Sequence, residues 1–322
     1  MNPKTILVTG CGGFIGGNFV NTFQKKFPKT KIVGTDNFST GKRESLNRDI
    51  VFHRGSINDP IFLEKVFSAE KPEYVFHFGA LPRVSFSVEE PAKTTLTNVY
   101  GTTLLLEKSR DHKVKRLIFS SSSSVYGGAK KLPTKESENP PKPISPYALQ
   151  KYMGELLMKN FSSLYDLDTV SLRYFNVYGP GQFGDSAYST VVSAWLEGLY
   201  FPARKKLFIE GDGKQSRDFC FVDNVVQANI KAMQFKKKFK GEEFNVAHGE
   251  RISLIEVKRL IEKLTNKKLN LETKPDRKGD VRHTHANISK ALKWFGYKPT
   301  VGFEEGLEKT VEWFEKRIKG RI

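Results

Sequence analysis

The chain has 322 residues, 38% of them hydrophobic and 12% aromatic, which is enough for a sizeable core in one large or two smaller domains. This composition excludes an intrinsically disordered chain. The 53 Lys and Arg residues outnumber the 35 Asp and Glu residues and give a net charge of +18, which favours anionic ligands. The basic residues do not interleave with aromatic ones as in nucleic-acid-binding modules, so nucleic acid is not the expected partner.

Cysteine usage and apolar runs bear on the compartment. Cys11 and Cys220 are far apart and lack the spacing of a disulfide framework or a metal site, which fits a reducing cytoplasm. The apolar run at residues 6–8 is too short for the core of a signal peptide. No run approaches the roughly 18–20 apolar residues of a membrane span. We therefore expect a cytoplasmic protein with no metal and no membrane insertion.

The order of elements predicts a Rossmann-type, doubly wound parallel α/β sheet, because short apolar runs alternate with helix-like segments. The expected strands are Thr5–Thr9, Lys31–Thr35, Ile50–His53, Tyr74–Phe78, Arg116–Ser120 and Thr169–Tyr174. The expected helices between them are Phe14–Phe27, Ile61–Ser68, Thr94–Ser109 and Tyr147–Leu164.

After Asn176 the pattern changes to polar, glycine-rich loops between separate helices. These helices are expected at Val191–Leu199, Val222–Gln234, Leu254–Leu264 and Phe303–Ile318. We divide the chain into an α/β domain over residues 1–175 and a smaller C-terminal, substrate-binding lobe over residues 176–322. Residues from about 222 to 250 are expected to pack back on the first domain.

A glycine loop follows the first expected strand and opens the first expected helix. The spacing of Gly10, Gly13 and Gly16 allows a tight turn, close approach of a pyrophosphate and close packing of helix on strand. Asp36 ends the second strand, where a carboxylate accepts a hydrogen bond from ribose and repels a 2′-phosphate. The loop therefore predicts NAD as cofactor. A plain surface turn at Asp36 is the alternative, and Lys42 and Arg43 soften the selectivity against NADP.

A second constellation carries redox chemistry. Tyr147 and Lys151 are four residues apart, so both lie on one face of their helix, and a cation beside a phenol lowers the pKa of the phenol. Upstream, the fifth strand runs into five serines at residues 120–124, where a doubly wound sheet binds its ligand. Such a Tyr–Lys pair alone is more often a surface contact. Together with the glycine loop, it predicts proton transfer coupled to hydride transfer.

These motifs resemble those of extended short-chain dehydrogenases/reductases that modify nucleotide sugars, over nearly the whole chain. The matching stretches are residues 8–16 (VTGCGGFIG), 36–41 (DNFSTG), 147–151 (YALQK), 173–179 (RYFNVYG), 211–213 (GDG), 216–219 (SRDF) and 279–283 (GDVRH). Dehydratases and decarboxylases of this family carry a carboxylate where this chain has residues 122–124. The resemblance is therefore to the 4-epimerases, and within them to the UDP-N-acetylglucosamine 4-epimerase and UDP-glucose 4-epimerase group.

The resemblance implies roles for individual residues. Tyr147, Lys151 and Ser122 would be catalytic. The NAD site would comprise Gly10, Gly13, Phe14, Ile15, Gly16, Asp36, Asn37, Ser39, Thr40, Gly41, Ser56, Ile57, Phe78, Gly79, Ala80, Asn98, Tyr147, Lys151 and Tyr174. The UDP-sugar would meet Arg83, Ser122, Ser123, Ser124, Tyr147, Asn176, Arg217, Arg277 and Thr284. Asn98 would order water or backbone near the nicotinamide, and Arg217 and Arg277 would clamp the diphosphate.

Two positions bear on selectivity. Thr284 aligns with the residue that admits or excludes an N-acetyl group, and a small side chain there admits it without excluding the smaller sugar. Ser56 stands where the family usually has an aspartate facing adenine. We therefore expect interconversion of UDP-N-acetylglucosamine and UDP-N-acetylgalactosamine by transient oxidation at C4. The alternatives are a UDP-glucose 4-epimerase, a dual enzyme, another nucleotide-sugar dehydratase or decarboxylase, a net dehydrogenase, and an idle relative that binds RNA. Relatives commonly dimerise through the helix that carries Tyr147, so a homodimer is expected.

Overall fold

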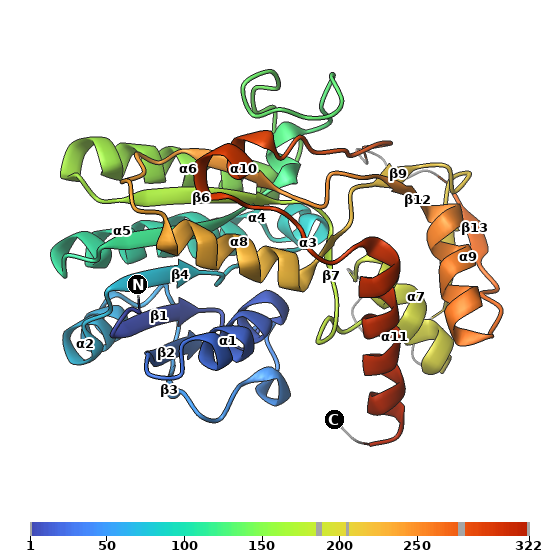
Figure 1. Cartoon of the computed structure of the whole chain (residues 1–322), viewed down its shortest axis with the longest axis horizontal. Helices are drawn as coiled ribbons and strands as arrows, with labels where there is room; N and C mark the ends of the chain where they lie inside the picture. Colours follow the sequence, from blue (N-terminus) through green and yellow to red (C-terminus); the bar gives the residue numbers. More distant parts are fainter. Residues whose placement is uncertain (1, 185–188, 204–205, 276–280, 321–322) are drawn as a thin grey trace.

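The computed structural model describes residues 2–184, 189–203, 206–275 and 281–320. Its centre is a seven-stranded parallel sheet in the order β11-β6-β5-β4-β1-β2-β3 (Figure 1). The strands are β1 (Thr5–Thr9), β2 (Lys31–Asp36), β3 (Val51–Arg54), β4 (Tyr74–His77), β5 (Arg116–Ser122), β6 (Thr169–Tyr174) and β11 (Glu243–Val246). This confirms the predicted Rossmann-type sheet, because the chain order reverses on either side of β1.

Helices cover both faces of the sheet, and β1 shows how the sequence dictates this. Successive side chains of a strand point to opposite faces, so Ile6 and Val8 join one core and Leu7 the other. The first core holds residues of α1 (Phe14–Lys26) and α8 (Val222–Gln234), and the second holds residues of α2 (Pro60–Glu70), α5 (Gly101–Asp111) and α6 (Pro146–Tyr165). Both faces of β1 are therefore covered by helices.

The helix expected over Thr94–Ser109 is interrupted. The structure has α4 (Pro91–Thr95), a π-helical turn η2 (Leu96–Tyr100) and then α5, preceded by the short α3 (Val84–Glu89). A π turn inserts an extra residue into the helical repeat, which periodicity alone does not reveal. Its consequence is that the Asn98 side chain is buried toward α6.

The C-terminal lobe lies beside the sheet, at the right of Figure 1, and has its own apolar core. Its helices are α7 (Val191–Tyr200), α9 (Leu254–Thr265) and α11 (Phe303–Ile318). Three two-stranded pairs complete it: β7 (Val177–Tyr178) with β10 (Cys220–Phe221), β9 (Ser216–Arg217) with β12 (Ile252–Ser253), and β8 (Phe208–Glu210) with β13 (Glu272–Lys274). No helix in the described ranges is long and apolar enough to cross a bilayer.

Helix α8 lies against the sheet, and strand β11 belongs to it. Helix α8 packs against α1, and β11 pairs with β6 in parallel to form the edge of the sheet. Helix α10 (Ser289–Phe295) then packs on β11. Strand β11 and helix α10 were not predicted, since each is short, with four and seven residues. The division of the chain near residue 175 stays an interpretation.

Candidate active site

A cavity of about 1200 Å³ runs along the carboxyl ends of the parallel strands and reaches the C-terminal lobe. Its wall includes the glycine loop after β1, the ends of β2, β4 and β5, the start of α6 and the loop after β7. This is the edge where a doubly wound sheet binds ligands, at the point where the strand order reverses.

The glycine loop is closely packed, and two glycines are required by geometry. Gly10 has φ +72°, and a Cβ there would lie 2.7 Å from the backbone nitrogen of Gly79. A Cβ on Gly16 would lie 2.1 Å from the carbonyl oxygen of Gly10. Gly13 precedes the first turn of α1, whose residues Phe14, Ile15 and Gly16 line the cavity, and N–H groups of a first helical turn have no partner within the helix. The loop therefore leaves space and N–H donors for a pyrophosphate.

Asp36 holds this loop from the end of β2. Its Oδ2 accepts a hydrogen bond from the Gly12 N–H at 2.9 Å, and its Oδ1 accepts one from the Phe38 N–H at 2.7 Å. Burial raises the pKa of Asp36 above its usual value, and these backbone hydrogen bonds act in the opposite direction. The carboxylate lines the cavity beside Gly12, in the position that the ribose of a dinucleotide requires.

Most residues predicted for the cofactor lie in the wall of this cavity. They are Gly10, Gly13, Phe14, Ile15, Gly16, Asp36, Asn37, Ser39, Thr40, Gly41, Ser56, Ile57, Phe78, Gly79, Ala80, Tyr147, Lys151 and Tyr174. Asn98, expected to order water or backbone near the nicotinamide, is not in this wall but is buried behind it. Its amide accepts from the N–H of Leu81 and donates to the carbonyl of Leu81, so it positions the backbone of a residue that lines the cavity.

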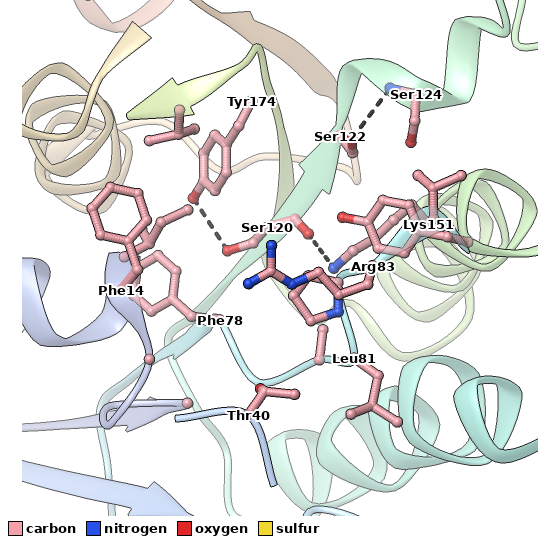
Figure 2. Close-up of a pocket in the computed structure, with 18 of the residues that line it drawn as sticks. Phe14, Thr40, Phe78, Leu81, Arg83, Ser120, Ser122, Ser124, Lys151 and Tyr174 are labelled. Atoms are coloured by element: carbon pink, nitrogen blue, oxygen red, sulfur yellow. Dashed lines mark hydrogen bonds between the residues drawn. The ribbon is translucent and has the colours of Figure 1, made fainter. Parts of the chain in front are cut away.

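The serine-rich end of β5 meets Lys151 and Tyr174 (Figure 2). The Lys151 Nζ donates to the carbonyl oxygen of Ser120 at 2.7 Å, and the Ser120 hydroxyl lies 3.2 Å from the Tyr174 hydroxyl. Ser122 Oγ accepts from the Ser124 N–H at 3.2 Å. The Ser124 hydroxyl is buried and has no hydrogen-bond partner among the described residues. An unpaired buried hydroxyl beside a cavity indicates a ligand that completes it.

Tyr147 begins α6, and its backbone N–H donates to the Ser87 hydroxyl at 3.0 Å. Burial raises the pKa of Tyr147 to about 12, against lowering by a hydrogen bond with Ser122 and by the charge of Arg83. Lys151, whose Nζ lies 5.9 Å from the tyrosine ring, was expected to lower this pKa, but burial of the phenol has the larger effect in the chain alone. Burial also lowers the pKa of Lys151 to about 8.

The sugar side of the cavity has an unusual backbone. Asn176 has φ 29°, a positive value that is uncommon outside glycine although asparagine adopts it more readily than most residues, and such conformations concentrate at functional sites. Its Nδ2 donates to the carbonyl oxygen of Asp218 at 3.1 Å and to the Thr284 hydroxyl at 3.0 Å. Both amide hydrogens are thus committed within the protein. The atom that Asn176 offers a ligand is the acceptor Oδ1, which suits a hydroxyl or N–H of the sugar better than a diphosphate.

The remaining predicted substrate residues fall in two groups. Arg83, Ser122, Ser123, Ser124, Asn176, Arg217 and Thr284 line the cavity. Arg217 is oriented by two carbonyl oxygens, of Ser216 and Arg282, each 3.0 Å from its NH1. Arg277 lies outside the described residues. The cavity therefore presents at least two guanidinium groups, Arg83 and Arg217, to an anionic ligand.

A buried polar network behind the serine strand was not predicted from the sequence. Glu155 accepts from Arg173 in a bidentate pair, with distances of 2.8 and 2.7 Å, and from the Ser121 hydroxyl. Arg173 also donates to the Tyr126 hydroxyl at 2.8 Å. Glu155 comes four residues after Lys151, one turn along α6, and this spacing is the signal that identifies it. The network fixes β5, β6 and α6 relative to one another.

The fold and the site together define a dinucleotide-binding α/β protein of the short-chain dehydrogenase/reductase class, with a Tyr–Lys pair beside its cofactor cavity. Residues 6–247 match the family model described as the NAD dependent epimerase/dehydratase family. The chain belongs to this family. The glycine cradle and Asp36 fit NAD as its cofactor.

Solved structures and curated relatives agree with this assignment. A UDP-glucose 4-epimerase from Thermotoga maritima, with UDP-glucose, is 40% identical, with a TM-score of 0.92 over 98% of this chain and 99% of that one. A UDP-N-acetylglucosamine 4-epimerase from Methanobrevibacter ruminantium, in complex with UDP-N-acetylmuramic acid, is 36% identical, with a TM-score of 0.90 over 98% of this chain and all of that one. A UDP-glucuronate 4-epimerase from Thermodesulfobacterium geofontis is 34% identical and aligns over 97% of each chain.

Proposed function

We propose that this protein interconverts UDP-N-acetylglucosamine and UDP-N-acetylgalactosamine by transient oxidation at C4. The broader activity, NAD-dependent 4-epimerisation of a UDP-sugar, is common to the relatives described above. Their names divide among N-acetylglucosamine, glucose and glucuronate, so the sugar rests on the residues of this chain.

The observation that carries the proposal is a Tyr–Lys site whose serine strand lacks a carboxylate. Among the described residues of the cavity wall, the acidic ones are Asp36, beside the glycine loop, and Glu89, exposed at the end of α3. Eliminating water or carbon dioxide from a sugar needs a further acid or base in addition to the tyrosine. Moving a hydride out and back on one carbon does not. The residues present therefore support epimerisation.

The preference for an N-acetylated sugar rests on Thr284. It is a small side chain in the wall, and its hydroxyl is held by the Asp218 N–H and the Asn176 amide, both at 3.0 Å. These bonds hold the Thr284 side chain against Asn176 and Asp218. We infer that the space a larger side chain would fill accommodates an acetamido group. The same space admits UDP-glucose, which is the second candidate and the ligand of the Thermotoga maritima relative.

Each catalytic residue has a separate task in the proposed reaction. The glycine loop and Asp36 would hold NAD, which when bound would supply the hydride acceptor and donor for C4. Tyr147 accepts the proton of the 4-hydroxyl, and the Ser122 hydroxyl, hydrogen-bonded to Tyr147, holds that oxygen in line. Lys151 supplies a positive charge that favours the phenolate, while its bond to Ser120 fixes its position. Arg217 grips the diphosphate, and a loose sugar pocket lets the keto intermediate present its other face.

Replacing Tyr147 with Phe tests this proposal. We expect kcat to fall by about 10²- to 10⁴-fold, since the phenol is the proton acceptor. UDP binding, measured by calorimetry, should be unchanged. Tyr152→Phe, five residues further along α6, is the matched control and should retain activity. Turnover by the Tyr147 variant comparable to the parent enzyme would overturn the assignment.

We also propose that the enzyme is a homodimer. Leu96, Tyr100, Leu149, Met153 and Leu156 are between 38% and 50% exposed, although all are apolar or aromatic. The last three are at i, i+4 and i+7 on α6 and so share one face of the helix. An apolar face of this size on two adjacent helical segments fits a second copy of the same face across a two-fold axis.

A cytoplasmic location stays a prediction from cysteine usage.

A further inference from the structure

Two loops from different parts of the chain meet beside the cofactor cavity. The first follows β2 and includes Lys42, whose backbone N–H donates to the carbonyl oxygen of Gly12 in the glycine loop at 2.9 Å. The second follows β7 in the C-terminal lobe and includes Phe183. The Lys42 Nζ lies 3.8 Å from the centroid of the Phe183 ring, and both residues line the cavity. This is a cation–π contact between the cofactor loop and the lobe.

Phe183 is anchored from the lobe side. Its ring meets Trp313 edge to face at 5.3 Å between centroids, and the Arg317 guanidinium lies 4.8 Å from its centroid. Arg317 is held in turn by an ion pair of 2.6 Å with Glu197, which is fully buried. The ring is therefore fixed to α11 and α7, and Lys42 comes to it from the other side of the cavity.

A second contact joins the same two regions. Asn18, on the first helix after the glycine loop, donates to the carbonyl oxygen of Pro180 at 2.9 Å and to that of Phe14 at the same distance. Separating the loop at residues 180–183 from the glycine loop thus breaks a hydrogen bond and a cation–π contact. Lys42 and Phe183 line the cavity, as does Gly181, which follows Pro180 in the chain.

We propose that the Lys42–Phe183 contact is a clasp that slows the release of bound NAD. A dinucleotide on the glycine loop lies beside this contact, and its departure requires the two loops to separate. Lys42 and Phe183 are therefore positioning residues for cofactor retention, which the epimerisation cycle requires because the same NAD must return the hydride. The clasp goes beyond the proposed sugar specificity and does not depend on it.

The test measures NAD release directly, apart from catalysis. Purified holoenzyme is loaded with radiolabelled NAD and chased with excess unlabelled NAD. Lys42→Met and Phe183→Leu should each release NAD about two- to five-fold faster, as expected for loss of one cation–π contact. The double variant should release it no faster than the faster single variant, because both substitutions break one contact. Lys42→Arg keeps the cation and should stay within about two-fold of the parent protein.

Lys274→Met is the matched control. Its Nζ lies 3.8 Å from the centroid of Phe208, the same separation, but in the lobe and away from the cavity. Its release rate should equal that of the parent. Multiplying effects in the double variant would overturn the proposal, because Lys42 would then act on the NAD phosphates independently of Phe183. Unchanged release from Phe183→Leu would overturn it as well.

Discussion

Replacing Glu155 with Gln tests the buried network that supports the serine strand. Glu155 and Arg173 are 1% and 2% exposed in their side chains and are joined by two hydrogen bonds of 2.7 and 2.8 Å. The substitution leaves the guanidinium charge buried without its counter-ion, which costs about 3–5 kcal/mol. We expect the free energy of unfolding to fall by that amount in urea titrations followed by circular dichroism.

The variant should also change the pH dependence of activity. Burial lowers the pKa of Lys151 to about 8, and the charge of Glu155 acts in the opposite direction. Loss of that charge should therefore lower the pKa of Lys151 further, and the decline of activity at high pH should begin at a lower pH. Glu304→Gln, whose partner Lys263 lies 2.8 Å away on the surface, is the matched control and should unfold at the parent urea concentration. An equally small effect of Glu155→Gln would refute the role assigned to this network. Replacing both members, Glu155 with Leu and Arg173 with Met, removes the unpaired buried charge as well, so the free energy of unfolding should recover.

Three further predictions concern charge, substrate and assembly. The pKa of Lys151 is about 8, so its proton is lost as the pH rises through that value, and kcat/KM should decline above it; a pH profile that stays flat well above pH 8 would contradict this. Thr284→Tyr should reduce kcat/KM for UDP-N-acetylglucosamine at least about ten-fold relative to UDP-glucose, in a competition assay with both sugars, because the larger ring fills the acetamido space. Met153→Glu combined with Leu156→Glu should convert a dimer into a monomer in light scattering, while a variant that stays dimeric would place the interface elsewhere.

The elements that the sequence predicts well are those whose periodicity is long and undisturbed. Strand β6, helix α8 and helix α11 begin and end at the predicted residues. The glycine spacing also identified the cofactor loop, because its chemistry is local to seven residues. By contrast, short strands such as β9 and β12 exist only because distant segments pair, and no local pattern specifies them.

The surroundings of Tyr147 could not be predicted from the sequence. The spacing of Tyr147 and Lys151 places both on one face of α6, but it does not give the burial of the phenol or the bond from Lys151 to Ser120. Those features depend on β5 and α3, which pack against α6 from elsewhere in the chain. Likewise, the π turn at Leu96–Tyr100 determines where Asn98 points, and the residue pattern alone predicts an uninterrupted helix.

The most direct test of the central claim is incubation of the purified protein with UDP-N-acetylglucosamine and no added cofactor. We expect UDP-N-acetylgalactosamine as the product, with no net formation of NADH, since the hydride returns to the carbon it left. An oxidised sugar and NADH in an amount equal to the enzyme-bound NAD, without any epimer, would instead show a net dehydrogenase. Salt-sensitive retention of RNA without any sugar product would contradict the account altogether.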